Sequence, residues 1–311
     1  MKKVLCIGNA SYDISFLTED YPTENKKYRI EEKIESGGGP ASNAAYLLGK
    51  WNADVYFAGI VGNDTFGKTI ESEFKSVNVN TDFLEFDDNN GTTLASIIIN
   101  KKSGTRTVLA YRDPDIKYNK EINIKPDIIL VDGQEYETSK KVIESNPEAI
   151  SVIDAGRAVE NVINLAKMVT YVVCSKDFAE GFTNLELNIN DKNSIYKVYE
   201  IMEQNFNNVV ITLEEKGTLY KKEGKLYIMP SIKTTQLDST GAGDYFHGSF
   251  VYGLLNGFSI EKNIRMSNIT GALSVMKVGA RQSCPSLEEV VEKYNAKWNN
   301  RLYKTSNIRF T

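Results

Sequence analysis

Asp238 and Asp244 bracket a run of small residues, Ser-Thr-Gly-Ala-Gly, and an apolar stretch typical of a helix follows. Gly241, Ala242 and Gly243 carry little or no side chain, so their backbone N–H groups can approach an anion closely. A helix that begins here points the positive end of its dipole into the same turn. Asp244 is unsuited to binding the anion, because like charges repel, but it can accept a proton from a neutral nucleophile. An anion cradle beside a base is the minimum equipment for transferring a phosphoryl group to a hydroxyl.

The same residues also suit a plain helix N-terminus, in which Asp238 or Ser239 caps the helix and the glycines only turn the chain. Both interpretations place a helix from Tyr245 onward. The rest of the sequence has to decide between them.

The composition is ordinary for a globular protein of 311 residues, with 41% hydrophobic and 25% charged residues. The net charge of −4 gives no support to a surface that binds the phosphate backbone of nucleic acids. Three widely spaced cysteines, Cys6, Cys174 and Cys284, indicate a reducing setting without a disulfide framework. The sequence contains no run of about 18 apolar residues, which is the length that a membrane-spanning helix requires. We therefore expect a cytoplasmic protein without a membrane partner.

Apolar segments of strand length alternate with segments of helical periodicity along most of the chain. Strands are predicted at residues 3–8, 54–61, 128–131, 151–154, 171–174 and 209–213, and helices at 40–48, 65–74 and from 245 onward. This alternation predicts an α/β fold with a mainly parallel sheet covered by helices on both faces. No shift in composition marks a boundary, so residues 1–311 are predicted to form a single domain.

Two polar regions, at about 10–36 and 90–113, are typical of exposed strands and loops rather than of core. In the second region, strands at 92–100 and 105–111 flank a turn. We expect the two regions to pair into one small β lid on the α/β body. The free strand edges of such a lid favour a homodimer formed lid to lid.

A rival phosphate-binding signal runs from Gly62 to Thr69 and matches the pattern G-x-x-x-x-G-K-[ST] between a predicted strand and a predicted helix. This hypothesis makes the protein a P-loop NTPase with Lys68 on the phosphates. Against it, Asp64 would bring a negative charge among amides meant for phosphate, and Phe66 would add bulk where the chain must wrap closely. The alternative is a strand, a turn and a helix with a solvated Lys68.

Three stretches together resemble the ribokinase-like (PfkB) family of carbohydrate kinases, and the resemblance spans essentially all 311 residues. They are the glycine-rich segment at 37–49, the strand-turn-helix segment at 59–67 and the signature at 238–244. Shorter motifs are similar to ketohexokinases (104–107 and 175–177) and to sulfofructose kinases (22–24 and 246–248). The resemblance implies a ribokinase-like three-layer α/β/α sandwich with a mainly parallel central sheet and a small β-sheet lid.

ATP-dependent phosphorylation of a sugar hydroxyl is the activity that this resemblance implies. Asp244 takes the position of the general base. The anion hole for the γ-phosphoryl group falls on Gly241, Ala242 and Gly243. The sugar site falls on Asp13, Gly38, Gly39 and Asn43. Arg106, on the proposed lid, either meets a second anionic or polar part of the substrate or is a solvated hairpin arginine.

The nucleotide loop of the family resembles the segment that holds Thr212, Glu214 and Gly217, and Asn268 falls near the adenine region. Glu214 replaces a glycine there, and its carboxylate would oppose the ATP phosphates unless it points outward. His247 either touches a ligand or is a packed, hydrogen-bonded core histidine.

Metal ions are also implied by the resemblance. The Asn-x-x-Glu magnesium motif is not intact, because Ser175 stands at the asparagine, and Asp177 with Glu180 offers a partial substitute for indirect binding of Mg²⁺. In the same comparison Glu180 also reads as an ordinary surface residue. A monovalent cation site, for K⁺, falls on Asp238, Thr240, Gly279 and Ser283.

The expected partners are therefore ATP and a small sugar, and the short motifs favour a ketose or a modified ketose. Two alternatives stay open beside the P-loop NTPase. One is a nucleoside kinase of the same family. The other is a sensor that binds sugar or nucleotide without catalysis.

Overall fold

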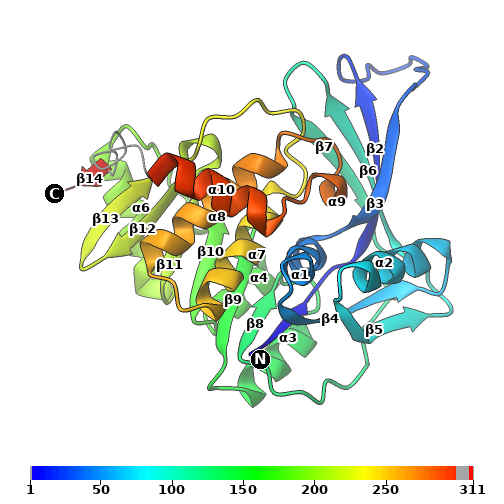
Figure 1. The fold of residues 1–311 in the computed structure, drawn as a ribbon, viewed down its shortest axis with the longest axis horizontal. Coiled ribbons are helices and arrows are strands. Elements are labelled where there is room, and N and C mark those ends of the chain that lie inside the picture. The colour runs from blue at the N-terminus through cyan, green and yellow to red at the C-terminus, as the bar shows by residue number, and fades with distance from the viewer. Residues whose placement is uncertain (1, 299–307, 311) are drawn as a thin grey trace.

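The computed structural model describes residues 2–298 and 308–310, and a ten-stranded sheet runs through them (Figure 1). Its strands in chain order are β1 (Lys3–Ile7), β4 (Asp54–Gly62), β5 (Asn80–Asp87), β8 (Ile128–Val131), β9 (Ile150–Ala155), β10 (Tyr171–Ser175), β11 (Val209–Thr212), β12 (Thr218–Lys222), β13 (Lys225–Met229) and β14 (Ile308–Phe310). In space the order is β14-β13-β12-β11-β10-β9-β8-β1-β4-β5. The strands from β5 to β11 are parallel, and β12, β13 and β14 continue the sheet in antiparallel pairing.

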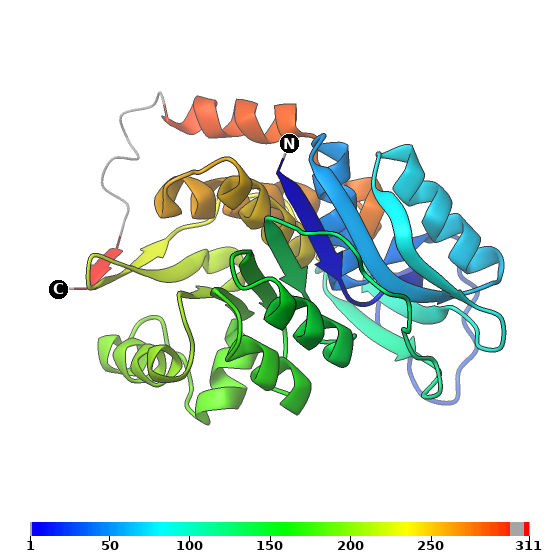
Figure 2. The same cartoon turned by 90° about the horizontal axis from the view of Figure 1, so that it is seen from below.

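Helices cover both faces of this sheet, as Figure 2 shows. One face carries α1 (Pro40–Lys50), α2 (Thr65–Ser76), α7 (Ala242–Leu255) and α8 (Ile260–Ser274), with α9 (Ala280–Ser283) and α10 (Leu287–Trp298) outside them. The other carries α3 (Tyr136–Ser145), α4 (Glu160–Ala166), α5 (Lys176–Thr183) and α6 (Lys192–Asn205). Side chains alternate along β1: Leu5 and Ile7 pack under one helical layer, and Val4 and Cys6 under the other. The predicted three-layer sandwich is confirmed.

A separate four-stranded sheet stands at one end of the molecule (Figure 1). It consists of β2 (Ser11–Thr18), β3 (Lys33–Gly38), β6 (Thr93–Asn100) and β7 (Arg106–Tyr111), in the order β3-β2-β6-β7. Because β2 pairs with β6, the regions 10–36 and 90–113 come together as predicted. The apolar side of β6 packs on Leu17 and Val278, and every residue of β7, at the sheet edge, is exposed. We call this sheet the lid.

The structure corrects two expectations. The polar segment β2 was expected to be exposed, but Tyr12, Asp13 and Ser15 are buried. This strand is an inner strand of the lid, paired with β3 and β6, and it also contacts α2 of the body. Strand β5 was not predicted, because its sequence Asn-Thr-Asp-Phe-Leu-Glu-Phe-Asp is polar, as suits a strand at the sheet edge.

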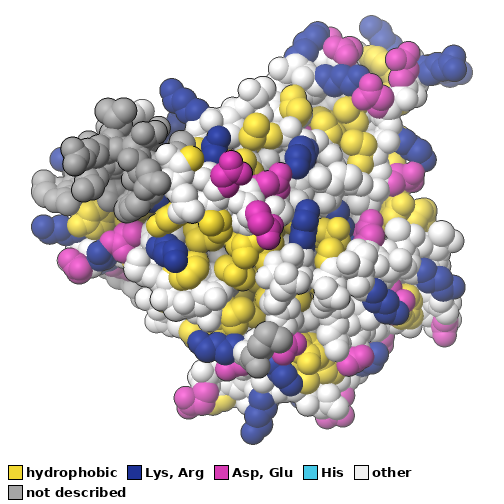
Figure 3. Space-filling model, viewed as in Figure 1, with side chains coloured by type: hydrophobic (Ala, Val, Ile, Leu, Met, Phe, Trp, Pro, Cys, Tyr) yellow, Lys and Arg dark blue, Asp and Glu magenta, His cyan; other side chains and the backbone are white. Residues whose placement is uncertain are grey.

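The surface and the cysteines agree with the composition. Figure 3 shows cationic and anionic side chains interspersed over one face. Cys6, Cys174 and Cys284 are buried and free. Among the described residues, no helix is both long and apolar enough to cross a membrane.

Candidate active site

Helix α7 begins at the carboxyl edge of the parallel strands, where ligands bind in open α/β sheets. Gly241 is its N-cap residue, with φ 79° in the left-handed region, and it accepts the amide of Tyr245 at 2.9 Å. No side chain of the described residues caps this helix, so the plain-cap interpretation is wrong. Amides in the first turn of a helix lack intrahelical acceptors. A Cβ added to Gly243 would meet no described atom within 4 Å, so an anion can reach these amides.

Asp244, one turn into this helix, is held by a residue of another helix. The side-chain amide of Asn43, on α1, donates to Asp244 Oδ2 at 2.7 Å. Asn43 is buried, and its Oδ1 has no hydrogen-bond partner within the described part of the chain. An oriented carboxylate and an unsatisfied buried acceptor thus lie together, which suits a ligand that brings hydroxyl groups.

Asp13 lies beside this pair at the base of the lid. Its Oδ1 accepts the Ser11 hydroxyl at 2.8 Å, and its side chain is 7% exposed. A Cβ at Gly38 would lie only 2.1 Å from Asp13 Oδ2, so this carboxylate needs a glycine beside it. Burial raises the pKa of Asp13 to about 6; the Ser11 hydrogen bond opposes this rise and repulsion from Asp244 adds to it.

Gly39 turns the chain from the lid into α1. Its φ is 97°, and a Cβ there would lie 2.4 Å from the carbonyl oxygen of Asn9. The structure therefore brings the predicted sugar-site residues to one place at the start of α1, next to Asp244.

Two further carboxylates, to which the sequence analysis assigned no role in the site, lie at neighbouring strand ends. Asp132, after β8, accepts the amides of Asn9 at 2.8 Å, Gln134 at 2.9 Å and Ala41 at 3.2 Å. Burial raises its pKa, against these hydrogen bonds. Asp154 lies near the end of β9, and burial raises its pKa to about 7, opposed by His247. The sequence offered one indication of both residues, because each is an acidic residue at or just after the end of an apolar strand.

The lid contacts the signature segment directly. Arg106 is exposed, yet its guanidinium donates to the hydroxyl of Ser239 at 2.5 Å. The side chain of Gln236, three residues before Ser239, donates to the carbonyl oxygen of Gly104 at 3.0 Å. The β6–β7 hairpin therefore contacts the segment that leads into α7.

The predicted nucleotide residues surround the 3-10 turn η1 (Glu214–Lys216) after β11. Glu214 has φ 53°, a left-handed backbone conformation that explains why a glycine suits this position. Gly217 closes the turn, donating to Glu214 and accepting from Leu213. The Thr212 hydroxyl donates to the backbone carbonyl oxygen of Cys174 at 3.3 Å.

Asn268 lies on α8 and is buried. Its Oδ1 accepts the Thr218 hydroxyl at 2.7 Å, and its Nδ2 donates to the Met229 carbonyl at 3.0 Å. Its amide therefore ties α8 to the start of β12 and the end of β13, next to the turn at η1.

The residues predicted for Mg²⁺ are engaged within α5 and the loop after it. Glu180 accepts the Leu187 amide at 2.7 Å and pairs with Lys176 at 3.4 Å, while Asp177 is exposed. Ser175 caps α5 through the Phe178 amide at 3.0 Å. No cluster of three or more His, Cys, Asp or Glu side chains in the described residues is arranged to hold a metal ion.

The residues predicted for a monovalent cation are joined in one buried cluster. Asp238 accepts the Thr240 amide at 2.9 Å, the Thr240 hydroxyl at 2.6 Å and the Gly279 amide at 2.9 Å. The Gly279 carbonyl accepts the Ser283 amide at 3.0 Å. This oxygen-rich donor set fits a hard cation such as K⁺.

The rival loop from Gly62 to Thr69 is closed on itself. Asp64 caps α2 by accepting the Gly67 amide at 2.8 Å, and it also accepts the Thr92 amide at 2.9 Å. Burial raises the pKa of Asp64, but these hydrogen bonds outweigh that effect and lower it overall. Because this carboxylate already accepts the Gly67 amide and brings a negative charge into the loop, the loop is unsuited to bind a phosphate.

The fold and this site define a small-molecule kinase with a β-sheet lid. A model of the pfkB family carbohydrate kinases matches residues 1–287, and the chain belongs to that family. It is therefore a phosphotransferase that acts on a hydroxyl group, and the P-loop and sensor alternatives are wrong.

Relatives and solved structures agree with the family. The chain is 28% identical over 310 residues to a ribokinase of Lactococcus lactis, covering 94% of this chain and 97% of the relative. It is 24% identical over 307 residues to a nucleoside kinase of Methanocaldococcus jannaschii, covering 94% and 97%. The structure of Arabidopsis thaliana ribokinase complexed with ribose and ATP superimposes with a TM-score of 0.80 at 21% identity, covering 94% of this chain and 98% of that one.

Proposed function

We propose that this protein transfers the γ-phosphoryl group of ATP to a hydroxyl of a small carbohydrate, with Asp244 as the general base. The contact between Asn43 and Asp244 carries the proposal, because it aims a carboxylate at the mouth of the amide-lined start of α7. Both sheets act as one kinase domain in this account, since the substrate lies between the lid and the body.

The transfer step follows from this arrangement. Asp244 takes the proton of the acceptor hydroxyl as its oxygen attacks the γ-phosphorus in line. The bond from that phosphorus to the bridging oxygen of the β-phosphate breaks, and ADP leaves. The backbone amides of the predicted anion hole at Gly241, Ala242 and Gly243, joined by the amide of Asp244 and by the helix dipole, stabilise the charge on the transferring group.

The acceptor is held by groups that match hydroxyls. Asp13 accepts from one or two of them, and the free Oδ1 of Asn43 accepts from another. Gly38 and Gly39 let the ligand lie against the backbone. Arg106 closes the site from the lid through Ser239, which keeps water from competing with the acceptor.

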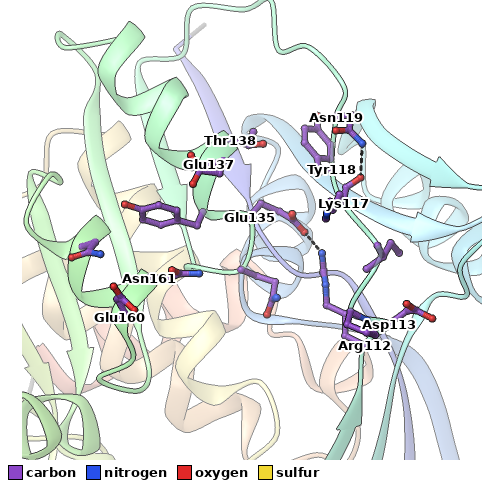
Figure 4. A pocket seen from close by; sticks show the side chains of 15 residues that line it. Arg112, Asp113, Lys117, Tyr118, Asn119, Glu135, Glu137, Thr138, Glu160 and Asn161 are labelled. Carbon is purple, nitrogen blue, oxygen red and sulfur yellow. Dashed lines mark hydrogen bonds and ion pairs between the residues drawn. The ribbon is translucent and has the colours of Figure 1, made fainter.

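A cavity of about 940 Å³, which is drawn in Figure 4, is lined in part by Gln134, two residues beyond Asp132. It lies between the segment 112–119 and the starts of α3 and α4. Its lining has four carboxylates, two cationic side chains and several amides, and Arg112 is already paired with Glu135 at 2.7 Å. Such a lining suits an uncharged, hydrogen-bonding group better than a second anion. It favours an acceptor with an additional neutral part, so a nucleoside is a second candidate beside a ketose.

Two metal ions, Mg²⁺ and K⁺, are also part of the proposal. Mg²⁺ bound to ATP would neutralise charge on the phosphates, and it needs few protein ligands. Asp177 and Glu180 are proposed to act on it only indirectly, given their present contacts. Asp238, Thr240, Gly279 and Ser283 are proposed to hold K⁺ close to the anion hole, where it would keep the turn before α7 in place.

The test is ATP consumption by the purified protein across a panel of aldoses, ketoses and nucleosides. We expect turnover with at least one ketose or nucleoside, and no turnover of that acceptor by Gly243→Arg, whose side chain enters the open space before the amides. A protein that consumes no ATP with any member, or a fully active Gly243→Arg, contradicts the proposal.

A further inference from the structure

His247, on α7, has a hydrogen-bond acceptor at every polar position of its ring. Nδ1 lies 2.6 Å from the carbonyl oxygen of Gly243 and 3.1 Å from Asp154 Oδ2. Nε2 lies 3.0 Å from the carbonyl oxygen of Val173. The ring is 3% exposed, which confirms the packed, hydrogen-bonded interpretation of this residue.

The groups within hydrogen-bond distance of the ring nitrogens are all oxygen acceptors. A neutral imidazole has one donor and one acceptor nitrogen. The carbonyls of Gly243 and Val173 cannot donate, so a neutral ring would set one lone pair against a carbonyl oxygen. An imidazolium donates from both nitrogens, and the side chain of Asp154, 11% exposed, supplies the opposite charge.

The Gly243 contact links this ring to the reaction. The Gly243 carbonyl and the Asp244 amide belong to the same planar peptide unit. A donor that fixes the carbonyl therefore also fixes the direction of the Asp244 N–H at the start of α7. That amide faces the transferring phosphoryl group in the function proposed above.

We propose that Asp154 and His247 form a buried ion pair that fixes the Gly243–Asp244 peptide and so positions the anion hole for transfer. This inference rests on the proposed function for its kinetic part only. His247 is a positioning residue, because it acts through the peptide and does not touch the substrate.

The charges around the pair determine how it responds to pH. Acidic groups face it from three elements: Asp244 on α7, Asp132 after β8 and Cys174 on β10. Burial raises the pKa of Asp154 to about 7, His247 opposes that rise, and repulsion from Asp244 and Asp132 adds to it. Below this pH the Asp154 carboxyl gains a proton, and the pair loses its negative charge.

The first experiment is nitrogen NMR of the ring in untagged protein labelled with ¹⁵N-histidine. His247 is the only histidine in the sequence, so the spectrum reports one ring. At about pH 8, above the pKa of about 7 for Asp154, the proposed ion pair requires protons on both ring nitrogens. Asp154→Asn removes the counter-charge, so one nitrogen should lose its proton at the same pH. A neutral ring in the unmodified protein at this pH overturns the proposal, whatever the activity.

The second experiment compares His247→Asn with His247→Gln. The Asn amide reaches the place of Nδ1 and can donate to Gly243, whereas the Gln amide reaches the place of Nε2 and can donate to Val173. Both variants leave Asp154 without its counter-ion, so they form a matched pair. We expect kcat to fall about ten- to a hundredfold in His247→Gln and clearly less in His247→Asn, with the acceptor KM within about twofold of the parent.

Each result has one meaning. Equal losses of kcat in two equally folded variants, judged by Tm, overturn the positioning role. If the parent protein phosphorylates no acceptor, the proposed function fails, while the NMR experiment still decides whether the ion pair exists.

Discussion

Asn43 Nδ2 lies 2.7 Å from Asp244 Oδ2, so a residue of α1 orients a carboxylate on α7 that is 201 positions further along the chain. The contact joins the glycine-rich segment at 37–49, which leads from the lid into α1, to helix α7. It also leaves one oxygen of Asn43 free for a ligand. The proposed acceptor site and the proposed base are therefore joined by a direct hydrogen bond.

Asp244→Asn tests the base. We expect turnover to fall about 10²-fold or more, because that is the usual scale of general-base loss, with little change in Tm. The matched control is Lys68→Ala, which removes an exposed side chain from the closed loop at residues 62–69. Near-parent activity in Asp244→Asn, or a collapse of activity in Lys68→Ala, would contradict the assignment.

Asn43→Asp tests the orientation of the base. A second carboxylate in contact with Asp244 makes proton uptake by the pair easier. We expect the acidic limb of the pH–rate profile to move up by about one pH unit or more. Asn43→Ala removes the donor without adding charge and should move the limb less. Identical profiles for the two variants would rule out the electrostatic link.

Asp13 should make both stability and acceptor binding depend on pH. Its pKa rises from the ordinary 3.8 to about 6 in the folded protein, so the folded state holds the proton more tightly than the unfolded state. The free energy of unfolding should fall as pH rises from about 4 to about 6 and stay flat above. Acceptor KM should rise below about pH 6, because protonated Asp13 is a poorer hydroxyl acceptor.

Asp13→Asn is the matching variant. We expect it to gain up to about 3 kcal/mol of stability at neutral pH, since the buried charge is gone. It should also bind the acceptor more weakly at every pH. Urea unfolding at several pH values checks the first effect and acceptor KM the second; an unchanged pH dependence of unfolding would disprove the account of Asp13.

Glu214→Gly tests the nucleotide loop. The residue is exposed and has φ 53°, so glycine removes backbone strain, and it also removes a carboxylate from the turn proposed to hold the nucleotide. We expect the KM for ATP to fall about three- to tenfold. The control is Glu215→Gln, a carboxylate of the same turn that is paired with Lys216 at 2.8 Å. An equal change in the KM for ATP in both variants would show that the Glu214 carboxylate does not act specifically on ATP binding.

Leu109→Lys tests the proposed lid-to-lid homodimer. Leu109 and Tyr111 are 62% and 64% exposed on one side of the edge strand β7, where a second copy would cover them. We expect the parent protein to elute as a dimer and this variant as a monomer. Leu185→Lys, at an exposed leucine away from the lid, should leave the dimer intact. A monomeric parent would reject the prediction.

The strands of the sheet interior were predictable because burial on both faces leaves continuous apolar runs, as in β1 and β8. The edge strand β5 lacks such a run, and its pairing with β4 comes only from tertiary packing. The lid could be predicted as two polar regions. The burial of Asp13 could not, because it depends on the glycine of β3 that lies against it.

The sequence alone determined the small-residue turn and the acid that follows it, because a turn and a helix start are encoded by adjacent residues. It also showed the resemblance to a kinase family. Only the tertiary structure separated the two candidate phosphate loops: the Asp64 carboxylate accepts the Gly67 amide in one, while the space in front of Gly243 is open in the other. The partners of Asn43 and His247 were likewise decided by packing. Such contacts join residues far apart in the chain, and their geometry depends on strand register and helix placement, which no local pattern records.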